Sequence, residues 1–189
     1  MQKAVIRGER DVAIVDVPDP QPKDGWVVVK VHAAPMCTEY KGYIAGRPND
    51  QLGHEAAGEV VAVARPGRLK LGDRVVVMPL FACGVCALCL VGDYIHCERS
   101  HDFRAVHGTD DGRATMAQYL LKPDWLLPVI PAGVSYERAS LACCALGPSF
   151  GAFETMRVGA FDTVLIVGAG PVGLGGIVNA RYRGARVLV

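Results

Sequence analysis

The stretch TVLIVGAGPVGLGGIVNARYRGARVLV, residues 163–189, decides the fold class of the second part of the chain. A short aliphatic run is followed by closely spaced glycines and then by a helical pattern. Pro171 suits the first position of that helix, and Gly184 suits its end. The stretch therefore predicts a strand, a tight turn, a helix and a second strand, which together make one βαβ unit.

The glycines of this turn have the spacing of a dinucleotide-binding fingerprint when they follow a strand and open a helix, although alone the spacing is common in unrelated loops. Gly168 permits the turn, Gly170 lets a pyrophosphate approach the backbone, and Gly173 permits close packing of helix on strand. The predicted cofactor-binding residues are Gly168, Gly170, Pro171, Val172 and Gly173. The segment ARVLV that ends the sequence holds no acidic residue to select NAD over NADP, so both stay open.

Upstream, the pattern changes to short β-rich runs separated by Gly, Pro and Asp. The expected strands are residues 12–17, 26–33, 56–64, 74–78 and 118–121. Such spacing favours an antiparallel barrel or sandwich. Ser135 suits a helix N-cap with Glu137 in the first turn, and a second helical stretch follows at 150–157.

Composition excludes several classes of partner. The chain has 189 residues and a formal net charge of +1, which gives no sign of a nucleic-acid partner or a membrane surface. No apolar stretch approaches the ~20 residues of a membrane span, and charges interrupt the N-terminal segment where a signal peptide would be apolar. We therefore expect a cytoplasmic protein without nucleic-acid or membrane partners.

Cysteine spacing is the most specific local signal. Of seven cysteines, Cys83, Cys86, Cys89 and Cys97 fall within one segment, between residues 79 and 112, that has little periodicity. Four thiolates close a tetrahedral zinc shell and leave no open position, so the pattern predicts a structural zinc ion. The alternatives are a redox pair, an iron site with thiolate ligands, and thiols without a ligand role. His96 could in principle replace Cys97.

A second set of metal-ligating side chains is scattered along the chain. It comprises Cys37, His54, Glu55, Cys143 and Cys144. Taken singly, each is typical of an ordinary core or surface residue. Open catalytic zinc sites do, however, draw three ligands from separated segments.

Several motifs occur together in a fixed order. They are GHEAAGEV (53–60), KLGDRVVV (70–77), the four-cysteine segment (83–97), CALGPSFGAF (144–153) and VLIVGAGPVGL (164–174). With these motifs the whole chain resembles the zinc-dependent, medium-chain alcohol dehydrogenase family. The resemblance implies a mainly β, GroES-like barrel domain with a zinc-binding lobe over residues 1–155. It also implies an incomplete α/β Rossmann domain over 156–189, with only its first βαβ unit.

The resemblance also implies the catalytic site. Cys37, His54 and Cys144 would bind a catalytic zinc, and Glu55 would be a neighbouring or exchanging carboxylate. Cys144 is preferred to Cys143 because it keeps the register of the family motif, which leaves Cys143 as an inert, packed thiol. The chain would then hold two zinc ions, and the fourth position of the catalytic zinc would receive an alcohol oxygen.

One segment departs from the family pattern. The family usually has Ser or Thr two positions after the first cysteine, then Asp, and often a later His that completes a proton relay. Here the run is Cys37-Thr38-Glu39-Tyr40-Lys41-Gly42, so Thr38 comes one position early and Glu39 stands in the hydroxyl position. Thr38 and Glu39 both stay candidates for the relay.

The implied activity is interconversion of an alcohol with an aldehyde or ketone by hydride transfer to NAD or NADP. The implied partners are a small-molecule alcohol or carbonyl compound and, for the parent enzyme, further copies of itself in a dimer or tetramer. One alternative is a truncated, non-catalytic zinc-binding fragment of such an enzyme. Another is a quinone or enoyl reductase of the same fold, against which Cys37, His54 and Cys144 argue.

Overall fold

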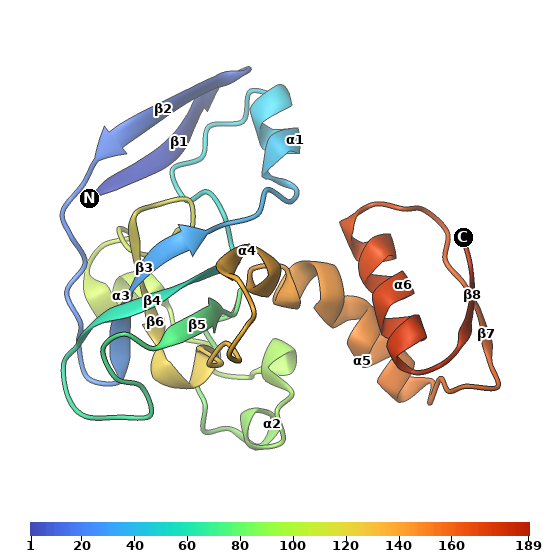
Figure 1. Cartoon of the computed structure of the whole chain (residues 1–189). Coiled ribbons are helices and arrows are strands. Elements are labelled where there is room, and N and C mark those ends of the chain that lie inside the picture. Colours follow the sequence, from blue (N-terminus) through green and yellow to red (C-terminus); the bar gives the residue numbers. More distant parts are fainter. The chain divides into compact units, whose positions relative to one another are not determined.

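The computed structural model describes the whole chain, residues 1–189 (Figure 1). In chain order the elements are β1 (Gln2–Gly8), β2 (Asp11–Asp16), β3 (Trp26–Ala33), α1 (Glu39–Ile44), β4 (Ala56–Val63), β5 (Arg74–Val77), α2 (Ala87–Leu90), η1 (Tyr94–His96), α3 (Phe103–His107), β6 (Tyr119–Pro123), η2 (Asp124–Leu126), α4 (Tyr136–Ala139), η3 (Ala142–Leu146), α5 (Gly147–Thr155), β7 (Thr163–Leu165), α6 (Pro171–Tyr182) and β8 (Arg186–Leu188). The five strands expected in the first part are all present, with ends that shift by a residue or two. No helix is both long and apolar enough to cross a membrane.

The chain forms two compact units, Met1–Ser140 and Leu141–Val189. The first unit contains all the antiparallel strands, and the second contains the parallel strand pair. The mainly β first part and the single βαβ unit are therefore confirmed. The domain boundary expected after residue 155 stays a prediction.

The first unit is organised by a four-stranded antiparallel sheet with the strand order β5-β4-β3-β6. Its inner face is rich in valine: Val29, Val60, Val75 and Val77 are fully buried and pack in one cluster. Burying a side chain of this size contributes on the order of 1.5–3 kcal/mol. The valines therefore fix which face of each strand turns inward, and with it the register of the sheet.

The register also decides which connecting segments meet. Ala33, at the end of β3, pairs with Ala57 near the start of β4, and Ala56 pairs with Val77 at the end of β5. Tyr119, at the start of β6, pairs with Lys30 on β3. The segments after β3, before β4, after β5 and before β6 consequently emerge at one edge of the sheet.

One strand of the first unit is absent from the sequence prediction. β1 pairs with β2 as an antiparallel hairpin, and its charged residues hide its strand pattern. Lys3 is only 6% exposed, and its ammonium group lies 2.8 Å from a carboxylate oxygen of Asp111. Asp111, from a distant segment, thus compensates the buried charge of Lys3. Sequence periodicity cannot reveal such a partner.

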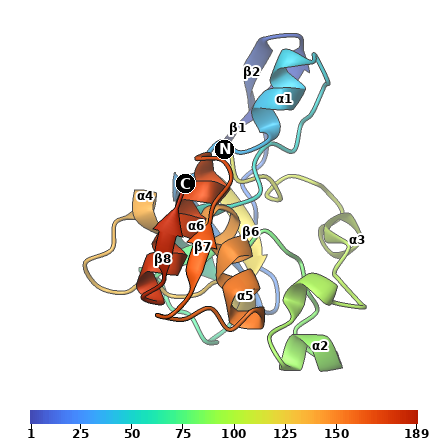
Figure 2. The same cartoon turned by 90° about the vertical axis from the view of Figure 1, so that its right-hand side faces the viewer.

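The second unit is built around α6, which packs beside the parallel strands β7 and β8 (Figure 2). Asn179 on α6 is 7% exposed, and its amide donates hydrogen bonds of 2.8 Å to the Leu146 carbonyl and to the Ser149 hydroxyl. These bonds tie α6 to η3 and α5. The π-helical turn η3 carries Cys143 and Cys144.

Helix ends follow the sequence prediction. The Ser135 side chain accepts a hydrogen bond from the Arg138 N–H and caps α4. Pro171 is the first residue of α6, and Gly184 follows its end with a φ of +81°. The helical stretch expected from Ser135 into the 140s consists of two elements, α4 and the π-helical turn η3, and the second expected stretch, 150–157, corresponds to α5.

An aromatic cluster holds α3 against the sheet. The ring centroid of His107 lies 4.5 Å from that of Trp26 and 4.6 Å from that of Phe103. Burial lowers the pKa of His107, and the nearby charges of Lys23 and His101 lower it further. His107 is therefore packed in its neutral form.

Gly175→Ala tests the packing of α6. A Cβ at Gly175 would lie 1.9 Å from the Ala145 carbonyl oxygen, so the helix or η3 must move. We expect a loss of about 3 kcal/mol in the free energy of unfolding, measured by urea denaturation. Gly151→Ala on α5 is the matched control, because nothing lies within 4 Å of its Cβ; it should be neutral or stabilising by up to about 1 kcal/mol. Equal stabilities for the two variants would contradict this packing.

The pH dependence of stability tests His107. Its pKa in the folded chain is below the usual 6.5, so the unfolded chain takes up the proton first as the pH falls. The contribution of His107 is therefore complete above about pH 6.5 and declines at lower pH. His107→Phe, which keeps an aromatic ring, should lose less Tm than the parent between about pH 7.5 and pH 5.5. The same loss in both proteins would show that His107 is not packed neutral.

Candidate metal and cofactor sites

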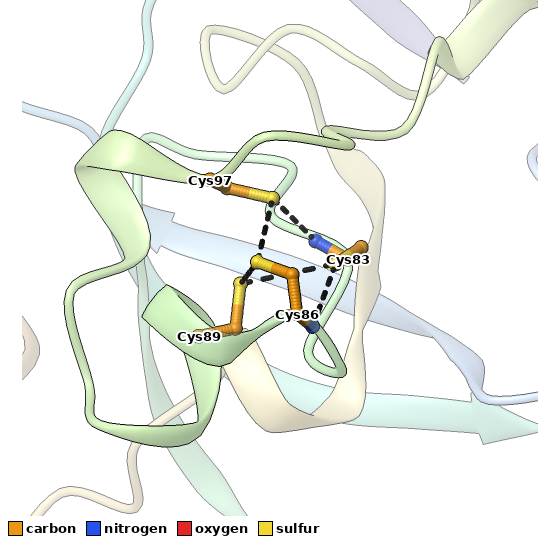
Figure 3. Close-up of side chains that lie close together, drawn as sticks. All are labelled: Cys83, Cys86, Cys89 and Cys97. Carbon is orange, nitrogen blue, oxygen red and sulfur yellow. Dashed lines mark hydrogen bonds between the residues drawn. The ribbon is translucent and has the colours of Figure 1, made fainter.

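The four cysteines of the segment between residues 79 and 112, which we term the cysteine lobe, converge on one point (Figure 3). Their sulfur atoms all lie within 4.8 Å of one another. Cys83 and Cys97 come from loop backbone on either side of α2, Cys86 is the residue just before α2, and Cys89 lies within it. The overlapping two-residue spacings therefore place three thiols around a tight turn, and the chain returns to supply the fourth.

The sulfur spacing fits a zinc ion. The separations are 3.9 Å for Cys83–Cys89, 3.4 Å for Cys86–Cys89 and 4.0 Å for Cys86–Cys97. Zn–S bonds of ~2.3 Å at tetrahedral angles require sulfur atoms ~3.8 Å apart. Four thiolates of this spacing would hold zinc with no open coordination position.

The protonation of the thiols is uneven. A hydrogen bond from the Cys83 N–H lowers the pKa of Cys97 to about 6, whereas burial and the neighbouring sulfur of Cys86 raise the pKa of Cys89 to about 12. The backbone around Cys89 and Glu98 lowers the pKa of Cys86. Thiolate ligands must lose their protons to bind metal, so this arrangement needs a cation to hold all four in the charged form.

The lobe has little apolar core apart from the thiols. Cys83, Cys86 and Cys89 are buried with Ala82 and Leu126, and the Trp125 indole N–H donates to the Ala82 carbonyl at 3.1 Å. Gly84 has a φ of +77°, and a Cβ there would lie 2.8 Å from the Trp125 ring. Gly84 therefore permits the expected turn and also lets the lobe approach Trp125.

Cys37 and His54 meet at the sheet edge described above. Cys37 follows β3, His54 precedes β4, and their ligand atoms lie within 4.8 Å of each other. The segment before His54 is held by a hydrogen bond from the Met116 N–H to the Leu52 carbonyl. The antiparallel register therefore brings together two residues that are distant in sequence.

Glu39 fixes both members of this pair. One of its carboxylate oxygens lies 2.7 Å from Nδ1 of His54, and the other accepts a hydrogen bond of 2.8 Å from the Cys37 N–H. Burial raises the pKa of Glu39, but the N–H groups of Glu39 and Cys37 and the His54 ring outweigh it and lower the pKa overall. A charged carboxylate on Nδ1 leaves Nε2 of His54 available to a metal, as is usual for histidine ligands.

Two cavities adjoin His54 within the first unit. One, of about 490 Å³, is bordered by Thr38, Glu39, Gln51 and His54 among others. The other, of about 230 Å³, is bordered by Gln51, His54, Phe81 and Arg113 among others. A small molecule beside His54 would thus have polar and aromatic walls.

The remaining expected site residues lie as follows. Thr38 is the N-cap residue of α1, but its hydroxyl caps no backbone N–H. Glu55 is 3% exposed. Cys143 and Cys144 belong to η3 in the second unit.

The glycine turn of the second unit connects β7 to α6. Gly168 has a φ of +95°, and a Cβ at Gly173 would lie 1.9 Å from the Gly168 carbonyl oxygen. Gly170 has open space around it, and Pro171 begins the helix. A surface hollow of about 620 Å³ runs along this turn, bordered by Gly168, Gly170, Pro171, Val172 and Gly173 among others. The hollow adjoins the N-terminus of α6, and a helix N-terminus offers the backbone N–H donors that a pyrophosphate requires.

Sequence reasoning missed two features of the region around His54. The contact of Glu39 with His54 was not foreseen, although a carboxylate soon after Cys37 was its available signal. Gln51, three residues before His54, was not singled out because nothing in its residue type marked it, and Arg113 because only the fold brings it beside His54.

Cys83→Ser tests the structural zinc. We expect the loss of about one zinc ion per chain, because a serine hydroxyl is a poor replacement for a thiolate ligand. The Tm of the protein should fall as well, since three of the four thiols belong to the buried core of the lobe. Elemental analysis and thermal unfolding provide the measurements, and unchanged zinc content in a folded variant would contradict the site.

Comparison with known proteins identifies the family of the chain. Residues 23–132 match the family model of the alcohol dehydrogenase GroES-like domain. An uncharacterized zinc-type alcohol dehydrogenase-like protein, YphC of Escherichia coli, is 31% identical over 100% of this chain and 57% of its own length. Sorbitol dehydrogenase of Bacillus subtilis is 32% identical over 100% of this chain and 55% of its own length.

A solved structure agrees with this result. The alcohol dehydrogenase TADH from Thermus sp. ATN1 has a TM-score of 0.82 and 32% identity, over 100% of this chain and 57% of its own. The chain spans little more than half the length of these relatives. The family match covers most of the first unit, which carries the cysteine lobe and the Cys37–His54 pair. The chain therefore belongs to the zinc-dependent, medium-chain alcohol dehydrogenase family, through its GroES-like domain.

Proposed function

We propose that the whole protein is a zinc-dependent, NAD(P)-linked oxidoreductase that interconverts an alcohol with an aldehyde or ketone. The observation that carries this proposal is the Cys37–His54 pair, with Glu39 bound to Nδ1 of His54. A thiol and an oriented imidazole at one sheet edge form part of an open zinc site. The relatives named above include an alcohol dehydrogenase and a sorbitol dehydrogenase, which supports the reaction class.

Cys37, His54 and Cys144 are the proposed ligands of the catalytic zinc. When bound, the ion would act as a Lewis acid that lowers the pKa of an alcohol. Glu39 keeps His54 in the tautomer whose Nε2 can bind a metal. Glu55 is proposed as the neighbouring carboxylate.

Thr38 is the proposed first member of the proton relay. Glu39 is already engaged by His54 and by the Cys37 N–H, so its carboxylate is poorly placed to receive the substrate proton. Thr38 borders the same cavity as His54, and a hydroxyl can pass a proton from one oxygen to another. These contacts favour Thr38 over Glu39, between which the sequence alone did not decide.

The glycine turn is the proposed site of the NAD(P) pyrophosphate. Positive φ at Gly168, open space at Gly170 and the start of α6 support it. A cytoplasmic location is also part of the proposal. A homo-oligomeric parent enzyme is a further part of the proposal.

Cys144→Ser tests the ligand assignment and the function together. We expect this variant to lose about one zinc ion per chain and the alcohol-dependent formation of NADH or NADPH by the full-length protein. Cys143→Ser is the matched control on the same turn and should keep both. Zinc loss from Cys143→Ser instead of Cys144→Ser would reverse the assignment. A fully loaded protein that oxidises no alcohol would refute the proposed function.

A further inference from the structure

Lys122 breaks the apolar pattern of the four-stranded sheet. It pairs across the strands with Val27, and it lies two residues after Leu120 on β6. Val27 and Leu120 both belong to the buried cluster of the inner face, so the strand pattern predicts an apolar residue at position 122. A lysine stands there instead, and it is only 2% exposed. Because burial of an ammonium group is costly, a lysine at a core position indicates a specific role.

The ammonium group of Lys122 reaches the segment that follows β5. It donates a hydrogen bond of 3.0 Å to the Leu80 carbonyl. It also lies 3.6 Å from the centroid of the Phe81 ring, well inside the ~6 Å range of cation–π contacts. The guanidinium group of Arg113 lies 5.9 Å from the same centroid, at the outer limit of that range. Lys122 therefore holds the backbone of Leu80 and the ring of the next residue.

Aromatic neighbours complete the surroundings of Phe81. Its ring centroid lies 6.0 Å from that of Trp26 and 5.6 Å from that of Phe103, and the ring stays partly exposed. Apolar packing has little directional preference, whereas an ammonium group is attracted to the face of a ring and not to its edge. The Lys122 contact therefore selects one orientation of the Phe81 ring.

The orientation of Phe81 matters because this ring forms part of the candidate catalytic region. Phe81 and Lys122 both border the cavity of about 230 Å³ that adjoins His54. A cavity of this volume accepts only a small molecule. A shift of the ring by about 1 Å would change how such a molecule lies beside the His54 imidazole.

We propose that Lys122 is a positioning residue: through the face of Phe81 it fixes one wall of the cavity beside His54, and with it the binding of small alcohols there. This inference rests on the proposed function, because it takes the substrate to lie at the site of His54. Lys122 acts through Phe81 and not on the reacting atoms. Without the ammonium group, the ring loses its preferred orientation and the cavity loses its defined shape.

Lys122→Met tests the proposal, because methionine is an unbranched apolar residue without a charge. Fluorine NMR of trifluoroethanol with the zinc-loaded protein gives the Kd of a small alcohol. We expect Lys122→Met to weaken this binding by at least about 5-fold. Lys122→Arg keeps a cation for the ring and should bind the alcohol more tightly than Lys122→Met. A Kd in Lys122→Met equal to that of the parent would refute the role of Lys122.

Lys23→Met is the matched control. The Lys23 ammonium group also donates to a backbone carbonyl, that of Val106, at 3.2 Å. Lys23 borders a different cavity, which does not adjoin His54. Lys23→Met should therefore leave the Kd of trifluoroethanol unchanged, and a loss equal to that of Lys122→Met would show that the effect is not specific to Phe81.

Phe81→Leu separates positioning from general destabilisation. It removes the ring but keeps the charge of Lys122, so it should weaken trifluoroethanol binding about as much as Lys122→Met does. In the Phe81→Leu background, Lys122→Met should add less than about 2-fold, because the group through which Lys122 acts is gone. Additive effects would overturn the proposal. So would a Phe81→Leu variant that binds the alcohol as the parent does, and this outcome is decisive even where Lys122→Met does not fold.

The Phe81 ring supplies a spectroscopic signature. The chain has five phenylalanines, and Phe81→Leu identifies the Phe81 signals in the NMR spectrum of protein with labelled phenylalanine. We expect these signals to shift and broaden in Lys122→Met, whereas those of Phe153, in the core of the second unit, stay unchanged. Phe81 signals that are the same in both proteins would contradict the proposal.

The same measurements keep this inference apart from the proposed function. Weaker alcohol binding and altered Phe81 signals in Lys122→Met, with no oxidation of any alcohol by the full-length parent, would support the role of Lys122 and refute the dehydrogenase reaction. Alcohol oxidation with the same KM in parent and Lys122→Met would support the reaction and refute the role of Lys122.

Discussion

The antiparallel pairing of β3 with β4 is the constraint on which the candidate catalytic region depends. Burial of the valine-rich faces sets the register, and the register puts the end of β3 beside the start of β4. Cys37 and His54 are carried to one edge of the sheet by the segments that emerge there. A one-residue slip would move the valines of this cluster to the opposite face of the sheet, so the packing of the core maintains the geometry at this edge.

The two cysteine arrangements of the first unit show different relations between sequence and metal binding. The cysteine lobe gathers four ligands from neighbouring positions, and its small core consists largely of the thiols themselves. Metal binding and folding of the lobe are therefore coupled, as in other closed zinc sites. The Cys37–His54 pair is held by the sheet and by Glu39, so its geometry exists through packing and hydrogen bonds.

Around His54, not every buried polar group has a hydrogen-bond partner. Glu39 is fully engaged, whereas the amide of Gln51 is buried and unused. Residues that support a site are held by hydrogen bonds, as Glu39 is.

The sequence by itself determined the features that depend on local spacing: the four-thiol lobe, the glycine turn, Pro171 at the start of its helix, and most of the strands. Each is encoded within a few neighbouring residues, so periodicity and turn chemistry suffice to find it. The strand β1 was not predicted, because the buried charge of Lys3 is compensated by Asp111, a partner far along the chain. Tertiary structure alone decided that Glu39 binds His54 and that the amide of Gln51 is buried without a hydrogen-bond partner. The register of a packed sheet is a cooperative property of several strands, and no single segment of the sequence contains it.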